Sequence, residues 1–152
     1  MKLRPANVSD AAAFAVLIMS HRALLTLAPN GRGAEQFFES VSTVALCEYL
    51  KSDRYAYTVA EDDGDILGFI GIRDRSHLFH LFVSKDHQGK GISRRLWNNA
   101  LSAASEQPKA VAFTVNSSLN AVPVYRRFGF AETAPVVEKH GVAFLPMRRE
   151  PT

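Results

Sequence analysis

Cysteine is nearly absent from this sequence of 152 residues, since Cys47 is the only one. A single cysteine cannot close a disulfide within the chain, which excludes the small disulfide-stapled folds of secreted proteins and favours a reducing compartment. We therefore expect a cytoplasmic location. Cys47 ends the apolar run Val44–Cys47, where we interpret it as a small buried hydrophobic residue.

Long hydrophobic runs are absent as well. The apolar run Ala11–Met19 falls far short of the roughly 20 residues needed to cross a bilayer. Ser9 and Asp10 precede it as helix-capping residue types, and no small-residue cleavage site closes it cleanly. We therefore expect a helix of a globular protein rather than a signal peptide, and no membrane partner.

The chain has no large excess of positive or negative charge. Eighteen Lys and Arg residues against fifteen Asp and Glu give a formal net charge of +3, and basic residues cluster only in pairs such as Arg94-Arg95 and Arg126-Arg127. This pattern does not indicate a nucleic-acid partner. Because 47% of the residues are hydrophobic, the chain can bury one ordinary core, and we expect a single domain over residues 1–152.

The most informative stretch runs from His77 to Ser105. Residues 77–83 are bulky and mostly apolar, which predicts a strand. From Ile92 onward, apolar residues recur at helical spacing, which predicts a helix to about Ser105. Between the two lies Gln88-Gly89-Lys90-Gly91. The first amides of a helix have no internal partners, so a glycine turn at this place can bind phosphate or can simply join strand to helix.

Similar reasoning gives the remaining elements. We expect strands at 2–5, 55–61, 66–73, 110–115, from 130 onward and at 142–147. We expect helices at 11–25, 34–41, from the cap Ser42 to about 50, and at 119–128. This order predicts a mixed α/β (α+β) fold, with a central mixed sheet of about six to seven strands flanked by about four to five helices. The passage from 77 to 115 predicts a parallel β-α-β crossover.

Two segments resemble a known family. No window fits a Walker loop, and Arg94 stands where a dinucleotide fingerprint needs its third glycine. The segment Val83–Ser93 instead resembles motif A of the GNAT superfamily of acetyl-CoA-dependent N-acetyltransferases. The segment Asn116–Phe130, with Asn120, Tyr125 and Gly129, resembles motif B of that superfamily.

This resemblance implies a GNAT fold and a coenzyme A site. In the family, the motif A strand and the next strand splay apart, and the pantetheine arm of the cofactor pairs with the exposed backbone. The resemblance assigns the arm to the backbone of the motif A strand, the pyrophosphate to the amides of the glycine turn, and further contacts to motif B. The implied cofactor-binding residues are Leu81, Phe82, Val83, Gln88, Gly89, Lys90, Gly91, Ile92, Ser93, Asn116, Asn120 and Tyr125.

The chemistry needs a base for the attacking amine and an acid for the departing thiolate. The resemblance assigns Tyr125 as the general acid, and the alternative is a core tyrosine. Family members often carry Glu or His at the place of His77, which we predict to be the base. Strict alternation along the strand puts His80 on the opposite face from His77, where we expect a core histidine. An ordered water in place of either histidine stays open.

The resemblance implies an N-acetyltransferase, an acyltransferase that moves an acetyl group from acetyl-CoA to a primary amine of a small molecule by direct attack in a ternary complex. No metal is expected. Acetylation of a protein or tRNA-linked amine, or non-catalytic acyl-CoA binding, are the alternatives, and a homodimer stays open. Glu35, Glu39 and Asp74 are candidates for attracting a cationic acceptor, with solvated surface charge as the alternative.

Overall fold

The computed structural model describes all residues, 1–152, and contains one eight-stranded sheet. The strands are β1 (Lys2–Pro5), β2 (Tyr55–Asp62), β3 (Asp65–Arg73), β4 (His77–Val83), β5 (Phe113–Ser118), β6 (Ala131–Glu132), β7 (Val137–Lys139) and β8 (Val142–Arg149). Their order in the sheet is β1-β2-β3-β4-β5-β8-β6, with β7 also on β8. Only β4 and β5 run parallel, so the sheet is mixed and the β-α-β crossover is confirmed.

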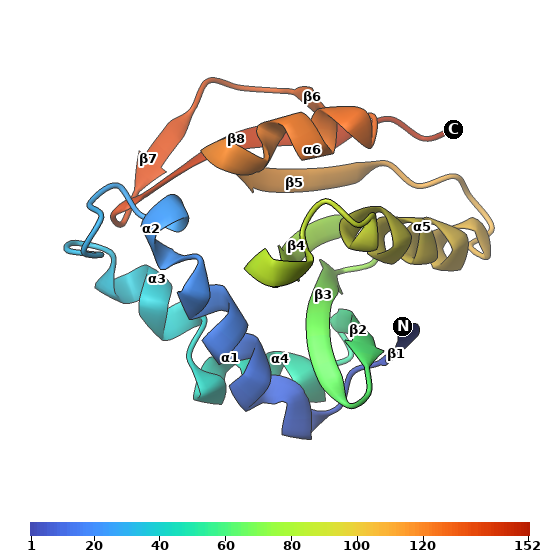
Figure 1. Ribbon diagram of the computed structural model, residues 1–152. Helices are drawn as coiled ribbons and strands as arrows, with labels where there is room; N and C mark the ends of the chain where they lie inside the picture. Colours follow the sequence, from blue (N-terminus) through green and yellow to red (C-terminus); the bar gives the residue numbers. More distant parts are fainter.

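Six α-helices flank this sheet: α1 (Ala11–Ser20), α2 (Arg22–Leu25), α3 (Glu35–Ser40), α4 (Thr43–Lys51), α5 (Ile92–Ser105) and α6 (Val122–Arg127). Short 3₁₀ turns lie at Val8–Asp10 (η1), Lys85–His87 (η2) and Leu119–Ala121 (η3). Helices α1 to α4 lie together on one side of the molecule, and α5 and α6 lie apart from them (Figure 1). No helix is both long and apolar enough to traverse a lipid bilayer.

Two hydrophobic clusters fill the two faces of the sheet. The first joins α5 and α6 to the sheet and includes Leu96, Trp97 and Tyr125. The second joins α1 and α4 to β2 and β3, where the rings of Phe14 and Phe69 stack with centroids 3.8 Å apart. Burying apolar area on both faces is what fixes the sheet between its helices.

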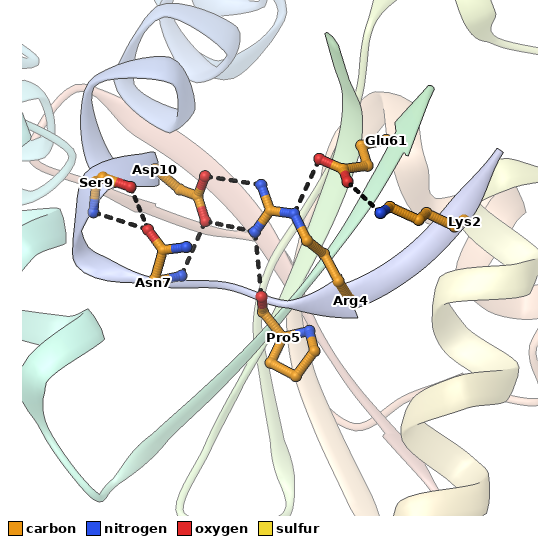
Figure 2. Close-up of polar contacts among 7 residues, drawn as sticks. All are labelled: Lys2, Arg4, Pro5, Asn7, Ser9, Asp10 and Glu61. Carbon is orange, nitrogen blue, oxygen red and sulfur yellow. Dashed lines mark hydrogen bonds and ion pairs between the residues drawn. The ribbon is translucent and has the colours of Figure 1, made fainter. Parts of the chain in front are cut away.

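Polar contacts fix the corner between β1 and α1, as Figure 2 shows. Asn7 accepts a hydrogen bond from the Ser9 amide, and Asp10 accepts one from the Asn7 amide, which together cap η1. Arg4 donates to both carboxylate oxygens of Asp10 at 2.9 Å and to Glu61 on β2 at 2.9 Å. Asp10 is buried, so this bidentate pairing supplies the partners that its charge requires.

A β-bulge changes which residues of β4 share a face. Gly71 of β3 pairs with His80 and Ile72 pairs with Leu78, so Phe79 is an extra residue opposite that junction. Leu78 therefore packs on the α5 side together with Leu81 and Val83, while Phe79 and Phe82 pack on the α1 and α4 side. The strict alternation predicted along this strand, which separates His77 from His80, was wrong, because alternation restarts after the bulge.

Other elements differ from the sequence-based boundaries. The helix expected over 11–25 is broken at His21 into α1 and α2. Leu24, on α2, is 54% exposed. Strand β5 covers Phe113–Ser118 rather than 110–115, because the polar residues 116–118 also pair with β8. Short strands raise the total to eight, and the mixed α/β class is confirmed.

Candidate functional site

Strands β4 and β5 separate after two residue pairs. His77 pairs with Thr114 and Leu78 with Val115, and no pair follows. Strand β5 instead continues along β8 as far as Ser118, which pairs with Phe144. Because β8 holds the far edge of β5, the end of β4 is left without a neighbour on that side.

The backbone groups of Leu81 and Val83 point into this gap. The Ser84 amide donates to the Leu67 carbonyl at 2.8 Å, so Ser84 and, by alternation, Phe82 direct their backbone groups toward β3. The N–H and C=O groups of Leu81 and Val83 therefore point the other way, where no strand pairs with them. Unpaired backbone groups are costly unless water, a side chain or a ligand bonds to them, so this edge can accept an extended ligand.

The glycine turn lies directly after β4. Gly89 has φ = 75° and Gly91 has φ = 80°, the left-handed region that glycine tolerates without strain. A Cβ at either position would meet no protein atom within 4 Å, so the space beside the turn is open. Gly91 is the N-cap residue of α5, whose first amides have no partner within the helix.

These features surround one cavity of about 480 Å³. The end of β4, the glycine turn and the start of α5 form one side of it, and η3 and α6 form another. The predicted site residues that line it are Leu81, Phe82, Val83, Gln88, Gly89, Gly91, Ile92, Ser93, Asn120 and Tyr125. Arg94 and Arg127 also line it and add positive charge.

Tyr125 belongs to α6, which begins at Val122 and carries Pro123 in its first turn. Its ring is packed against Phe128 and Phe130, with only 6% of the residue exposed. Burial raises the pKa of Tyr125 well above its usual value, so the hydroxyl stays protonated at neutral pH. The hydroxyl is not among the buried polar atoms that lack a partner, and the residue lines the cavity, so it can donate a hydrogen bond to a ligand.

Sequence reasoning missed two histidines in the cavity wall. His21, at the break between α1 and α2, bonds through Nε2 to the Val83 carbonyl at 2.9 Å. The Gln88 side chain donates to the same carbonyl at 3.3 Å. His87 also lines the cavity, and its Nδ1 is buried without a partner. No local pattern marks His21, because its contact joins residues 62 positions apart.

Three predicted site residues lie outside the cavity wall. His77 starts β4, where its Nδ1 lies 2.8 Å from Thr114 Oγ1, and roughly 13 Å of strand separates it from Leu81. Asn116 is exposed on β5, on the face opposite the buried Val115 and Ser117. Lys90 is exposed between the two glycines. The structure therefore brings the motif A backbone, Asn120 and Tyr125 together, but not these three side chains.

His80 is fully packed, as expected for a core histidine. Its Nδ1 lies 2.9 Å from the Tyr57 hydroxyl, and burial lowers the pKa of His80 to about 3, with smaller contributions from Arg73 and His77. Desolvation of the charged form dominates this shift. His80 is thus neutral at every ordinary pH, and it does not line the cavity.

The three acidic residues considered for acceptor binding lie elsewhere. Glu35 accepts a hydrogen bond from the Gly33 amide, Asp74 pairs with Arg54, and neither they nor Glu39 line the cavity. The part of the cavity wall that comes from the break between α1 and α2 and from α2 is formed by His21, Leu24 and Leu25. The segment after α2 is joined to the β7–β8 hairpin by a bond from the Leu27 amide to the Gly141 carbonyl at 2.9 Å.

No group of three His, Cys, Asp or Glu side chains is arranged to hold a metal ion. The polar groups that the cavity does offer are main-chain amides and carbonyls and the side chains of two arginines, two histidines, two serines, one tyrosine, one asparagine and one glutamine. Such a set suits a ligand with phosphates at one end and hydrogen-bonding amides along its length.

Comparisons with known proteins agree with this geometry. The chain is 31% identical over 116 residues to human N-acetyltransferase 8B, an alignment that covers 64% of this chain and 51% of the relative. It is 28% identical over 144 residues to the L-amino acid N-acyltransferase MnaT of Escherichia coli K12, covering 88% of this chain and 81% of that protein. The chain thus spans about half the length of the human relative.

The fold also matches solved structures. The PaiA N-acetyltransferase of Thermoplasma acidophilum in complex with coenzyme A superposes with a TM-score of 0.75 at 15% identity, covering 98% of both chains. The family model described as the acetyltransferase (GNAT) domain matches residues 25–151. The predicted GNAT fold is confirmed, and the chain belongs to the GNAT family of acetyltransferases.

Proposed function

We propose that this protein transfers an acetyl group from acetyl-CoA to a primary amine of a small molecule, by direct attack within a ternary complex. The observation that carries the proposal is the backbone edge of Leu81 and Val83, which no strand covers and which leads into the glycine turn at the start of α5. Family membership supports it, as does the coenzyme A complex of the structurally similar PaiA N-acetyltransferase.

In this proposal the cofactor follows the edge of β4. Its pantetheine amides pair with the backbone groups of Leu81 and with the Val83 amide, in the manner of an added strand. Its pyrophosphate accepts from the amides of the turn and the first turn of α5, where the helix dipole favours negative charge. Arg94 and Arg127, which line the same cavity, add positive charge for the phosphates.

Tyr125 is the proposed acid. The attack forms a C–N bond and breaks the C–S bond, which leaves coenzyme A as a thiolate. The hydroxyl of this buried tyrosine keeps its proton until that negative charge develops beside it, and then donates it to sulfur. Asn120 on η3 lines the cavity beside α6, where its amide can contact the pantetheine arm.

The attacking amine must be neutral. A lysine-like amine has a pKa of about 10.4, so forming its neutral state at pH 7 requires about 4.6 kcal/mol. A base near the amine reduces this barrier. The family resemblance suggests His77 for that role, and its ring lies outside the cavity wall.

A coupled assay tests the proposal. Acetyl-CoA turnover is measured across a panel of amines that includes amino acids, because one relative is an L-amino acid N-acyltransferase. We expect turnover with at least one small amine and a fall of tenfold or more in kcat for Tyr125→Phe, with coenzyme A affinity changed little. Absence of turnover with every amine, despite coenzyme A binding, would contradict the enzymatic proposal.

A further inference from the structure

His21 is a buried histidine that reaches the proposed cofactor edge from a distant part of the chain. Only 7% of the residue is exposed, it lines the cavity, and it lies between α1 and α2, where the backbone leaves helical geometry. Its Nε2 bonds to the Val83 carbonyl at 2.9 Å, and its ring lies 5.9 Å from that of Phe82. The helix break thus places an imidazole beside the edge of β4 that faces the gap.

The contact with Val83 fixes the tautomer of His21. A carbonyl oxygen can only accept, so Nε2 must carry the hydrogen, and in the neutral ring the lone pair is then on Nδ1. Nδ1 of His21 is not among the buried atoms without a partner, unlike Nδ1 of His87. It makes no hydrogen bond within the protein, so its lone pair is open to the cavity that the residue lines.

The surroundings keep this ring neutral. Burial lowers the pKa of His21 below its usual 6.5, the Val83 carbonyl raises it by a smaller amount, and Lys85 on η2 lowers it further. The other titratable or charged groups around the cavity are His87 on η2, Arg94 on α5, and Tyr125 and Arg127 on α6. None of the residues that line the cavity is a carboxylate. The free ring is therefore a base at neutral pH.

We propose that Nδ1 of His21 accepts the proton of the attacking amine in the acetyl transfer, an inference that rests on the proposed function. The amine nitrogen bonds to the acetyl carbon, Nδ1 takes a proton from that nitrogen, the C–S bond breaks, and the thiolate takes the Tyr125 proton. Solvent then returns the proton from His21 to Tyr125. The Val83 carbonyl orients the ring and stabilises the imidazolium, because a charged donor makes the stronger hydrogen bond.

Two variants at this position separate proton transfer from positioning. His21→Gln retains an N–H donor for the Val83 carbonyl but is no base, and His21→Ala removes both groups. We expect kcat to fall roughly 10²- to 10⁴-fold in both. We expect KM for acetyl-CoA to rise in His21→Ala and to change little in His21→Gln. Added imidazole should restore part of the kcat of His21→Ala.

The pH profile gives a readout that does not depend on these variants folding. With the amine saturating, kcat of the wild type should fall at low pH with a midpoint below 6.5. Lys85→Gln should move that midpoint upward, because it removes a positive charge that disfavours the imidazolium. His77→Ala, the rival assignment, should keep the same midpoint.

Several outcomes would overturn the inference. One is a kcat of His21→Gln within threefold of wild type, and another is that both His21 variants change only KM. The others are an unchanged midpoint of the kcat–pH profile in Lys85→Gln, or disappearance of the fall in kcat at low pH in His77→Ala. Wild-type turnover measured first distinguishes this failure from that of the proposed function. If wild type binds no coenzyme A and acetylates no amine, the function itself is refuted.

Discussion

Replacing Gly91 by alanine tests whether the turn before α5 binds phosphate. Gly91 has φ = 80°. An alanine in this left-handed conformation costs about 1–2 kcal/mol, and a more restricted unfolded chain offsets about 0.4–1 kcal/mol of it. No protein atom lies within 4 Å of the new Cβ, so packing adds no penalty. The free energy of unfolding should therefore fall by no more than about 1.5 kcal/mol.

Coenzyme A binding should respond far more strongly. The new methyl group occupies open space beside the amides proposed to hold the pyrophosphate, and it keeps the phosphates from approaching them. We expect the affinity for coenzyme A to fall at least tenfold, about 1.4 kcal/mol. Isothermal titration calorimetry gives the affinity, and urea unfolding gives the stability.

The chain provides a matched control in Gly64→Ala. Gly64 lies in the β2–β3 turn with φ = 82°, and a methyl group added there would also meet no protein atom within 4 Å. This variant should lose similar stability and bind coenzyme A as wild type does. Equal affinity in Gly91→Ala and wild type would refute the assignment of the turn to phosphate.

Two further predictions concern stability. Below pH 6.5 the unfolded state binds a proton at His80 that the folded state excludes, so the free energy of unfolding must fall as the pH falls. Between pH 6 and pH 4 we expect a loss of roughly 2.5 kcal/mol, measured by urea unfolding at each pH. This loss should be missing in His80→Gln. Arg4→Met leaves the buried Asp10 carboxylate without its cation and should cost roughly 2–4 kcal/mol, whereas Lys2→Met, at an exposed ion pair, should cost at most about 0.5 kcal/mol. Equal thermal shifts in these two variants would contradict the assigned role of Asp10.

Local patterns predicted the part of the site that is made of backbone. Bulky residues gave β4, and helical spacing gave the start of α5 at Ile92. The two glycines between them adopt positive φ angles, and the sequence shows this local requirement directly because glycine is the residue that tolerates them. The cap at Ser42 was found for the same reason, since its hydroxyl accepts from the Ala45 amide three residues on.

Long-range pairing explains what the sequence did not predict. The bulge at Phe79 depends on how β3 pairs with β4, and it changes the side of the sheet that each β4 residue faces. Residues 116–118 have a turn-like composition, yet β8 pairs with them and extends β5. His21 directly follows α1 and bonds to Val83, and the residues around either position give no sign of that contact.

The central claim is that coenzyme A pairs with the bare edge of β4, and residue-level amide hydrogen exchange by NMR tests it most directly. In the free protein, the amides of Leu81 and Val83 should exchange quickly, while that of Phe82, which faces β3, should exchange slowly. Saturating coenzyme A should slow exchange at Leu81 and Val83 by at least tenfold and leave Phe82 slow. Unchanged exchange at Leu81 and Val83 with coenzyme A bound would contradict the account.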